Sequence, residues 1–466
     1  MIIDKYKHVF AKNKFDVGEL KCNSPKIILT SELPIANRPY RTSFKDDTEI
    51  KKQLDALLKA GIIKPSYSSY AAPITLAFKK EDNARTRLCI DYRKLNAITK
   101  LDAEPIPRID AVLDKLTHAK FFSTIDLCSG YWHIKLDDNE SEKLAFTSNY
   151  GLFQFNRLPF GYKNSPAIFQ RAIRQILNKY QIKFALNYFD DIIVFSESIE
   201  EHAKHLEEIF KICGIENIKL KLSKCKFGKD TIDFLGYEIK QGSYTPNNTN
   251  VEIIKKLLPP RNVKDLQRFL GSINVYYKFI PQYAKLRMPL NNLLKKNQNW
   301  NWTPECQQSF QKLKDSLISK PILAIFNPNY PCHLYVDASK TAISCILKQQ
   351  KPNGNQHPIA FHSRRLRNYE INYTITELEC LAIIDSLDKF HCYLHGSHFT
   401  VHTDHNALVW LKNFKNPTGR LFRWSLKVSM YDFDIKYKKG STNVEADMLT
   451  RNPIAYHIIN TPQNLY

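Results

Sequence analysis

Two groups of acidic residues are the part of this sequence best suited to chemistry. In the first group, a strand-like run over residues 121–126 ends in Asp126, and Asp190 and Asp191 separate two short β-rich runs. This spacing predicts a tight hairpin with the two acids at its tip. Neighbouring carboxylates repel each other, and no cation stands beside these in sequence, so a divalent metal would stabilise them. Carboxylate oxygens suit Mg²⁺, and paired ions support in-line phosphoryl transfer. For an Asp-Asp pair taken alone, the alternative is a polar β-turn.

The second group consists of four separated acids in the last third of the chain. Asp337 lies inside an apolar strand-like run, Glu379 on an expected helix, Asp404 at the end of the next expected strand, and Asp447 in an Asn-Val-Glu-Ala-Asp segment. An acid within an apolar strand is costly unless it is paired or bound to metal. For any one of these acids the alternative is an ordinary surface carboxylate.

The elements around these acids predict three units and a tail. Polar, turn-rich stretches near residues 242–250 and 319–331 mark the breaks, so the expected units are 1–240, 241–325 and 326–455, followed by a tail at 456–466.

The middle unit is expected to be helical and basic. Apolar residues at three- and four-residue spacing predict helices over 263–270 and 305–313. Between 251 and 300 there are ten Lys or Arg and two acids, which indicates either a solvated helical face or a surface that tracks phosphates.

The last unit is predicted to be a compact α/β domain. A strand over 333–338 precedes a helix over 374–394, and a further strand is expected over 399–403. Five histidines between residues 391 and 405 invite a zinc hypothesis, but their spacing matches no finger pattern and a helix followed by a strand separates the side chains. His202 and His205 are expected to be solvated helix residues.

Composition points to a polyanionic partner. The chain has 466 residues and a formal net charge of +22, which favours nucleic acid or an anionic membrane surface. No run approaches the ~18 apolar residues of a membrane span, and the first residues are too polar for a signal peptide. The ten scattered cysteines suggest reduced thiols in the cytosol or nucleus.

Five motifs occur in order along the chain, at Arg87–Asn96, Phe122–Tyr131, Leu158–Gln170, Tyr188-Phe-Asp-Asp191 and Phe234–Tyr237. Of these, Tyr188-Phe-Asp-Asp191 is similar to the Tyr-x-Asp-Asp box of reverse transcriptases. Together the five motifs resemble the polymerase of gypsy-type (Metaviridae) LTR retrotransposons, which are relatives of retroviruses.

The resemblance implies a catalytic role for the first acidic group. Asp126, Asp190 and Asp191 would hold two metal ions, with the Leu127 backbone carbonyl beside them. Tyr131 would stack under the sugar of the incoming nucleotide and exclude a 2′-hydroxyl, although without the motif it would be interpreted as a core aromatic.

The resemblance also implies binding roles. Lys79 and Arg87 would grip the triphosphate, and the segment from Phe160 to Gln170 would line the nucleotide and template side. The basic helices at 251–300 would form the thumb, which favours the phosphate-tracking interpretation. The primer and template would contact Tyr188, Phe234, Leu235, Gly236 and Tyr237.

Two positions depart from the family pattern. Trp132-His133 stands where the family usually has His-Gln, and Phe189 stands where Val or Met is commoner. These differences bear on fidelity and processivity, not on the chemistry.

The second acidic group resembles the ribonuclease H domain of the same retroelements. Asp337, Glu379, Asp404 and Asp447 occur in the family's order, and the resemblance implies two-metal hydrolysis of RNA. Glu377 is the other candidate for the second acid of the family's set. Glu379 fits the motif better, because Ala382-Ile383 follows it three residues later.

The sequence therefore predicts an α+β polymerase right hand, with fingers, palm and thumb, followed by an α/β ribonuclease H-like domain. The expected function is RNA- and DNA-directed DNA synthesis with ribonuclease H activity, using two Mg²⁺ ions per site with Mn²⁺ as a substitute.

Expected partners are an RNA template, a DNA primer, an RNA/DNA hybrid, dNTPs and, as in relatives, a second copy of the chain. The expected location is cytoplasmic, within virus-like particles, with nuclear access. One alternative is a domesticated, catalytically silent nucleic-acid-binding protein. Another is an RNA-dependent RNA polymerase, which Tyr131 and the ribonuclease H signature disfavour.

Overall fold

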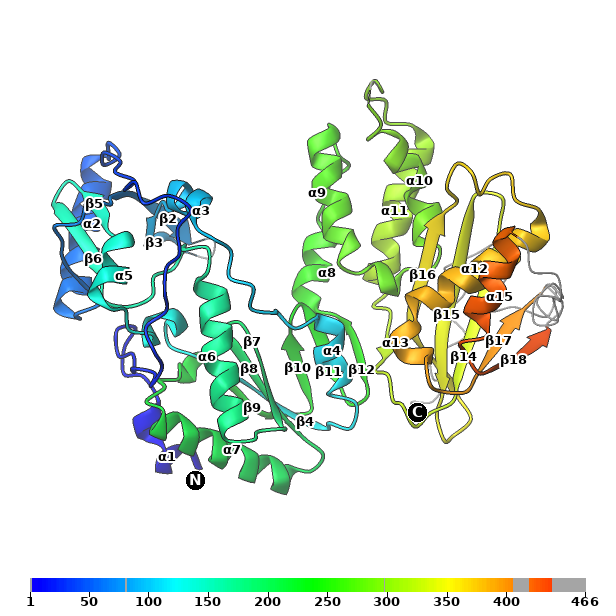
Figure 1. Ribbon diagram of the computed structural model, residues 1–466, viewed down its shortest axis with the longest axis horizontal. Helices are drawn as coiled ribbons and strands as arrows, with labels where there is room; N and C mark the ends of the chain where they lie inside the picture. The colour runs from blue at the N-terminus through cyan, green and yellow to red at the C-terminus, as the bar shows by residue number, and fades with distance from the viewer. Residues whose placement is uncertain (1, 80–81, 297, 405–418, 438–466) are drawn as a thin grey trace. The chain divides into compact units, whose positions relative to one another are not determined.

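The computed structural model describes residues 2–79, 82–296, 298–404 and 419–437, and gives only the backbone of the strand residues 78–79 and 82–86. The chain forms two compact units (Figure 1). One consists of the residues up to 112 together with 118–232, and the other of 113–117 together with the residues from 233 on. The boundaries expected near 240 and 325 stay a prediction.

A four-stranded sheet carries the first acidic group. Its strand order is β7-β8-β4-β9, with β4 over Phe121–Asp126, β7 over Ala185–Tyr188, β8 over Asp191–Ser196 and β9 over Lys226–Lys229. The strand expected over 121–126 is confirmed. Both α6 and α7 pack against this sheet, and they span Ser165–Lys179 and Ile199–Ile215.

His202 and His205 connect α7 to the sheet, so the expectation that both are solvated is wrong. His202 is 0% exposed, and its ring lies 2.7 Å from Ser123 Oγ and 2.8 Å from Ser196 Oγ. His205 stacks on Phe184 with the ring centroids 3.7 Å apart. An imidazole can be buried here because hydroxyl groups on two strands satisfy both of its nitrogens.

A second, five-stranded sheet completes the first unit, in the order β1-β6-β5-β2-β3. Its strands are β1 Ile63–Pro65, β2 Ala72–Lys79, β3 Asp82–Ile90, β5 Phe146–Ser148 and β6 Gly151–Phe155. The remaining helices of this unit are α1 Ile2–Lys5, η1 Lys7–Val9, α2 Phe44–Lys59, α3 Arg93–Ile98, α4 Ile109–Asp114, η2 Gly130–His133, α5 Asp138–Lys143 and η3 Leu222–Lys224, and α4 extends into the second unit.

The N-terminal segment is bound to the first unit by backbone contacts. Phe10 forms a parallel bridge with Leu220, and the Leu20 backbone N–H donates to the His133 carbonyl at 2.8 Å. Between these points Gly18 lies against a neighbouring backbone. A Cβ added there would meet the Asn217 carbonyl oxygen at 1.5 Å, so only glycine fits.

The second unit begins with a small sheet and a helical region. The sheet has the order β10-β11-β12-β13, spanning Thr231–Phe234, Tyr237–Lys240, Ser243–Pro246 and Leu323–Ala324. The helices are α8 Asn248–Lys255, α9 Val263–Asn274, η4 Tyr277–Phe279, α10 Tyr283–Asn292 and α11 Pro304–Ile318. The helices expected over 263–270 and 305–313 are confirmed within α9 and α11.

A five-stranded mixed sheet in the order β16-β15-β14-β17-β18 carries the second acidic group. The strands are β14 Cys332–Ala338, β15 Ala342–Gln350, β16 Gln356–Arg365, β17 Phe399–Thr403 and β18 Phe433–Tyr437. The helix expected over 374–394 divides into α12 Ile375–Lys389 and α13 His391–Leu394, because the helix ends at Phe390. The α12 helix packs on β14 and β15, with α15 (Gly419–Val428) beside it (Figure 1).

We expect Gly18→Ala to destabilise the first unit by about 1–3 kcal/mol, because the methyl group would overlap a backbone carbonyl that cannot rotate away. Urea unfolding followed by far-UV circular dichroism measures this change.

Gly271→Ala is the matched control, because an added methyl group meets nothing within 4 Å at this position in α9. It should leave stability unchanged or raise it by up to about 1 kcal/mol. Equal behaviour of the two variants would contradict the close approach at Gly18.

Candidate active sites

The structure brings Asp126, Asp190 and Asp191 together at one end of the β7-β8-β4-β9 sheet. Asp126 is the last residue of β4 and pairs in register with Asp191, the first residue of β8. Tyr188 pairs with Asp191 at the end of the β7–β8 hairpin, so Phe189 and Asp190 form its two-residue turn. The hairpin is as expected, but its turn lies one residue earlier than the sequence suggested. Asp191 therefore begins a strand and faces Asp126 directly.

The buried side chain of Gln170 holds this turn by hydrogen bonds. Phe189 has a positive φ of 52°, a strained backbone conformation for a bulky residue. Its N–H donates to Gln170 Oε1 at 2.8 Å, and Gln170 Nε2 donates to the Asn187 carbonyl at 3.3 Å. Gln170 is 1% exposed, so the structure places its side chain beneath the hairpin rather than on a nucleotide-facing surface.

Crowding of negative charge disfavours ionisation at this site. Burial, followed by the charges of Asp191 and Asp126, raises the pKa of Asp190 to about 6. Partial burial and Asp126 also raise the pKa of Asp191. The Asp190 Oδ1 atom is buried and has no hydrogen-bond partner among the described residues. A buried, crowded carboxylate of this kind is stabilised by a cation.

Lys224 supplies one positive charge, and the sequence analysis missed it. Its Nζ lies 2.9 Å from Asp126 Oδ2, and its charge opposes the pKa increase at Asp190 and Asp191. Lys224 lies 98 positions after Asp126, in η3. A run of lysines at 219, 221 and 224 is the signal that could have suggested it, although spacing does not show which lysine reaches the acids.

The donor chemistry of this group fits a divalent metal. Three carboxylates supply hard oxygen ligands, and Asp190 offers an oxygen that no described group satisfies. Within the described parts of the chain, no three His, Cys, Asp or Glu side chains are already arranged to hold an ion. The ion pair with Lys224 engages one of the Asp126 oxygens.

Tyr131 lies beside the acids in an aromatic cluster. Its ring centroid is 4.8 Å from that of Phe160 and 5.5 Å from that of Phe169. Burial, with a smaller contribution from Asp190, raises the pKa of Tyr131 to about 12. Phe160 is 45% exposed, which leaves its ring accessible to a ligand, and Leu127 is 4% exposed in a bridge with Leu220.

His133 fixes the turn that carries Tyr131. It is 0% exposed, and its Nε2 accepts from the Lys219 backbone N–H at 3.0 Å. The other nitrogen, Nδ1, therefore carries the proton and donates to the Gly130 carbonyl at 3.0 Å. Burial lowers the pKa of His133 to about 4.

The residues predicted to grip the triphosphate lie on the other sheet of this unit. Arg87 is exposed on β3, where it pairs in register with Ala77. The backbone of Lys79 ends β2, and its side chain lies outside the described residues. The structure thus places both on the β2–β3 hairpin and the acids on the four-stranded sheet.

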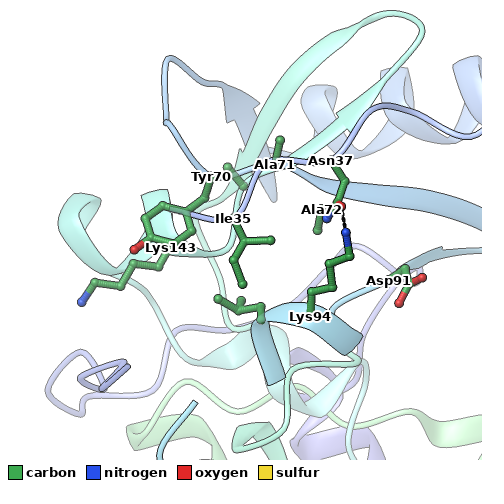
Figure 2. A pocket seen from close by; sticks show the side chains of 10 residues that line it. Ile35, Asn37, Tyr70, Ala71, Ala72, Asp91, Lys94 and Lys143 are labelled. Atoms are coloured by element: carbon green, nitrogen blue, oxygen red, sulfur yellow. Dashed lines mark hydrogen bonds between the residues drawn. The ribbon is translucent and has the colours of Figure 1, made fainter. Parts of the chain in front are cut away.

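A shallow hollow lies elsewhere in the first unit, between the start of β2 and α3 (Figure 2). Lys94 points across it, and its Nζ lies 2.5 Å from Asn37 Oδ1. At its edge the Arg93 guanidinium, helped by the Tyr40 hydroxyl, holds the pKa of the Asp91 carboxyl well below its usual range. The charged groups that line this hollow already have partners, and none of the predicted site residues lines it.

The residues predicted to contact the primer divide into surface and core positions. In the first unit, Tyr188 is half-buried beside Phe189. In the second unit, Phe234 is 3% exposed and Tyr237 is 4% exposed. Leu235 and Gly236 form a half-buried turn in which Tyr276 donates its hydroxyl to the Gly236 carbonyl at 3.1 Å.

Three acids of the second group, Asp337, Glu379 and Asp404, converge at the end of two parallel strands. Tyr335 of β14 pairs with His402 of β17, so Asp337 and Asp404, two residues further on, reach the same edge of the sheet. Glu379 approaches from α12 and accepts a hydrogen bond from the Ala338 backbone. Asp447, the fourth predicted acid, lies outside the described residues.

The structure distinguishes Glu379 from its competitor. Glu379 is 6% exposed, and burial, followed by the charges of Asp337 and Asp404, raises its pKa to about 8. Glu377 instead accepts a hydrogen bond from the Thr374 N–H in a capping box and pairs with Arg420. The carboxylate of Glu379 is therefore the one that faces the other acids.

Of the histidines considered for zinc, His391 and His395 pack on each other, with ring centroids 4.7 Å apart, and both contact Tyr431. His391 contacts the Tyr431 hydroxyl at 2.7 Å, and His398 contacts Asp432 at 3.1 Å. His402 stacks on Tyr335, with ring centroids 4.3 Å apart. These described histidines do not converge on one point.

Comparison with known proteins identifies both regions. A family described as "Reverse transcriptase (RNA-dependent DNA polymerase)" matches residues 78–239, and "RNase H-like domain found in reverse transcriptase" matches 302–401. The Pol polyprotein of Drosophila melanogaster transposon 297 is 38% identical over 426 residues, which cover 91% of this chain and 40% of that protein. The chain comprises the reverse transcriptase and RNase H-like domains of an LTR-retrotransposon Pol polyprotein. Its gypsy-type relatives include the Pol polyprotein of Drosophila transposon opus, which is 38% identical over 92% of this chain and 44% of its own length. This reverse transcriptase chain thus spans less than half the length of these relatives.

A solved structure agrees with the fold of this reverse transcriptase chain. A foamy viral protease–reverse transcriptase, in complex with double-stranded DNA, is 25% identical with a TM-score of 0.84, and covers 94% of this chain and 77% of its own. The predicted fold, a polymerase followed by a ribonuclease H-like domain, is confirmed.

We expect Gln170→Leu to destabilise the first unit by about 1–3 kcal/mol, because the partly buried Phe189 N–H loses its acceptor. Amide hydrogen exchange at Phe189 should accelerate, as measured by mass spectrometry of peptides that span the turn. Gln175→Leu is the matched control on the same helix, because Gln175 is exposed. If both variants leave exchange at Phe189 unchanged, Gln170 does not hold the turn.

The contribution of His133 and His202 to the stability of the first unit should be lost as the pH decreases from about 6.5 to about 4, whereas the raised pKa of Asp190 acts in the opposite direction over this range. Burial lowers the pKa of His133 and of His202 to about 4, so the unfolded chain takes up these protons first. Each histidine contributes up to about 3 kcal/mol to this loss. In urea titrations at several pH values, His133→Gln should show a smaller dependence on pH than the unmodified chain. His118→Gln, at an exposed position, should keep the original dependence.

Proposed function

We propose that this chain is an RNA- and DNA-directed DNA polymerase with ribonuclease H activity, which copies retrotransposon RNA into DNA. The observation that carries the proposal is the convergence of Asp126, Asp190 and Asp191 at one sheet edge, where their charges crowd. A turn that served only as a surface loop would not need a strained Phe189 beside an acid with a buried oxygen.

The acids would hold the metal ions on which both reactions depend. We assign two Mg²⁺ ions, with Mn²⁺ as a substitute, to Asp126, Asp190 and Asp191, and two to the second acidic group. Bound divalent ions supply Lewis-acid stabilisation of charge that develops on phosphate oxygens and activate the attacking oxygen. Because the charge of Lys224 already offsets part of the repulsion, the acidic group is held together before an ion binds.

The aromatic cluster would recognise the nucleotide. Tyr131 would lie under the sugar and leave no room for a 2′-hydroxyl, and the exposed ring of Phe160 would line the same space. Lys79 and Arg87 would bind the triphosphate, and the Leu127 backbone would help to hold the metal. We assign Gln170 a positioning role, because its side chain holds the turn that carries Asp190.

The second acidic group would hydrolyse the RNA strand of a hybrid. Asp337, Glu379, Asp404 and Asp447 would bind the metal ions there. Burial, followed by the charges of Asp337 and Asp404, raises the pKa of Glu379 to about 8, and a bound cation would offset this cost of its charged form. One oxygen of Glu379, Oε2, is buried with no hydrogen-bond partner among the described residues, which suits a metal ligand.

The partners we propose are an RNA template, a DNA primer, their hybrid and dNTPs. The net charge of +22 supports polyanion binding. We assign residues 1–240 to fingers and palm, 241–325 to the thumb, 326–455 to the ribonuclease H domain and 456–466 to a tail. Leu235 and Gly236 offer the half-buried turn for primer contact, while Phe234 and Tyr237 anchor it.

A cytoplasmic location, within virus-like particles, agrees with the thiols. All ten cysteines lie in described segments, and none of them forms a disulfide. In the described portion of the chain, no helix is both long and apolar enough to cross a bilayer.

Extension of a labelled DNA primer on an RNA template, with cleavage of the template followed in parallel, tests both activities. Asp190→Asn should lower synthesis by about a hundredfold or more and leave cleavage intact. Glu379→Gln should do the reverse.

Two conservative controls separate catalysis from folding. Asp230→Asn changes an exposed acid of the first unit, and Glu377→Gln changes the capping acid two residues before Glu379. Both should retain synthesis and cleavage. If the unmodified chain binds hybrid tightly but shows neither Mg²⁺-dependent activity, it is a silent nucleic-acid-binding protein and the proposal fails.

A further inference from the structure

Five aromatic rings form a continuous row that ends beside the polymerase acids. In order they are Phe15, Trp132, Phe160, Tyr131 and Phe169. The rings of Phe15 and Trp132 are nearly parallel, at 7° with centroids 6.2 Å apart. Trp132 meets Phe160 edge-on at 5.9 Å, and Tyr131 contacts Phe160 at 4.8 Å and Phe169 at 5.5 Å. We call this set the aromatic row.

The inner end of the aromatic row is tightly packed against the site. Gly130 precedes Tyr131, and a Cβ added there would lie 3.1 Å from the Phe169 ring and 3.4 Å from Asp190 Oδ1. Phe169 is 0% exposed, so it cannot move aside easily. If one ring of the row shifts, Phe169 therefore stays in place and the exposed ring of Phe160 moves.

The outer end of the row belongs to the N-terminal segment, more than a hundred residues earlier in sequence. Ser129 Oγ donates to the Lys14 carbonyl at 3.2 Å, and Cys128 Sγ lies 3.5 Å from the Asn13 carbonyl. The Lys14 ammonium lies 4.6 Å from the centroid of the Phe15 ring. Phe15 is thus held against the turn that carries Tyr131.

Stacking, rather than hydrogen bonding, determines where Trp132 lies. Its Nε1 atom is buried and has no hydrogen-bond partner among the described residues. An indole without a polar anchor is positioned by the rings that pack against it, here Phe15 and Phe160.

We propose that Phe15 and Trp132 are positioning residues for nucleotide selection, which hold the Phe160 ring where it limits the space beside Tyr131. This inference rests on the proposed function, because it takes Tyr131 and Phe160 as the nucleotide site. Removing either ring lets Phe160 move outward and enlarges that space. Discrimination between dNTPs and rNTPs then falls, although neither residue touches the acids.

Single-nucleotide incorporation with dTTP and with UTP, each as a function of concentration, measures this discrimination. In Phe15→Leu and in Trp132→Leu, the ratio of kcat/KM for the dNTP over that for the rNTP should fall about two- to tenfold. This fold-change corresponds to the interaction free energy of one aromatic pair. The change should appear chiefly in KM for the two nucleotides. A merely structural defect would lower both kcat values equally and leave the ratio unchanged.

Phe10→Leu is the matched control in the same segment. Phe10 is 8% exposed and packs on Phe210 at 5.5 Å, so its loss loosens the segment without changing the aromatic row. Its selectivity ratio should equal that of the unmodified chain. If Phe10→Leu lowers the ratio as much as Phe15→Leu, the effect is general loosening and the proposal is overturned.

Tyr131→Ala separates this inference from the proposed function. Loss of selectivity in Tyr131→Ala, with normal ratios in Phe15→Leu and Trp132→Leu, would leave the nucleotide site in place and refute the role of the row. An unchanged ratio in Tyr131→Ala would show that the nucleotide site itself was wrongly placed.

Discussion

The interaction on which both sites depend is the repulsion between carboxylates placed together at the ends of strands. In the first unit, burial and neighbouring charge raise the pKa of Asp190 to about 6, and in the second they raise that of Glu379 to about 8. Each group gains stability from a cation, which is why a divalent ion suits both places. Lys224 partly fills this need at Asp126. The rest of each unit must hold its acids together against this repulsion.

Buried polar side chains provide that support in the first unit. Gln170 accepts from the strained turn at Phe189, His133 joins the Gly130 turn to Lys219, and His202 joins α7 to two strands through serine hydroxyls. Such groups are tolerated in a core only because their hydrogen-bonding atoms find partners. The same requirement fixes their orientation, so the acids and Tyr131 occupy definite positions and do not relax apart.

The aromatic row extends this support to the surface around Tyr131 and Phe160 by packing alone. Its rings meet at offsets and angles that favour specific geometry, and one member, Trp132, has a buried N–H without a described acceptor. The N-terminal segment takes part because Gly18 lets it approach the Asn217 backbone closely. A segment distant in sequence thereby becomes part of the wall around a site on the sheet.

The sequence by itself determined the strand that ends in Asp126, the hairpin at Asp190 and the helices of the second unit, because these follow from spacing within a few residues, whereas the preference for Glu379 came from its likeness to a family motif. Only the tertiary structure decided which lysine meets Asp126, that Gln170 lies beneath the turn, that His202 is buried, and that Phe234 and Tyr237 are core residues. These properties arise from contacts between segments far apart in the chain. Periodicity records which face of an element is apolar, but not which distant polar group that face will meet.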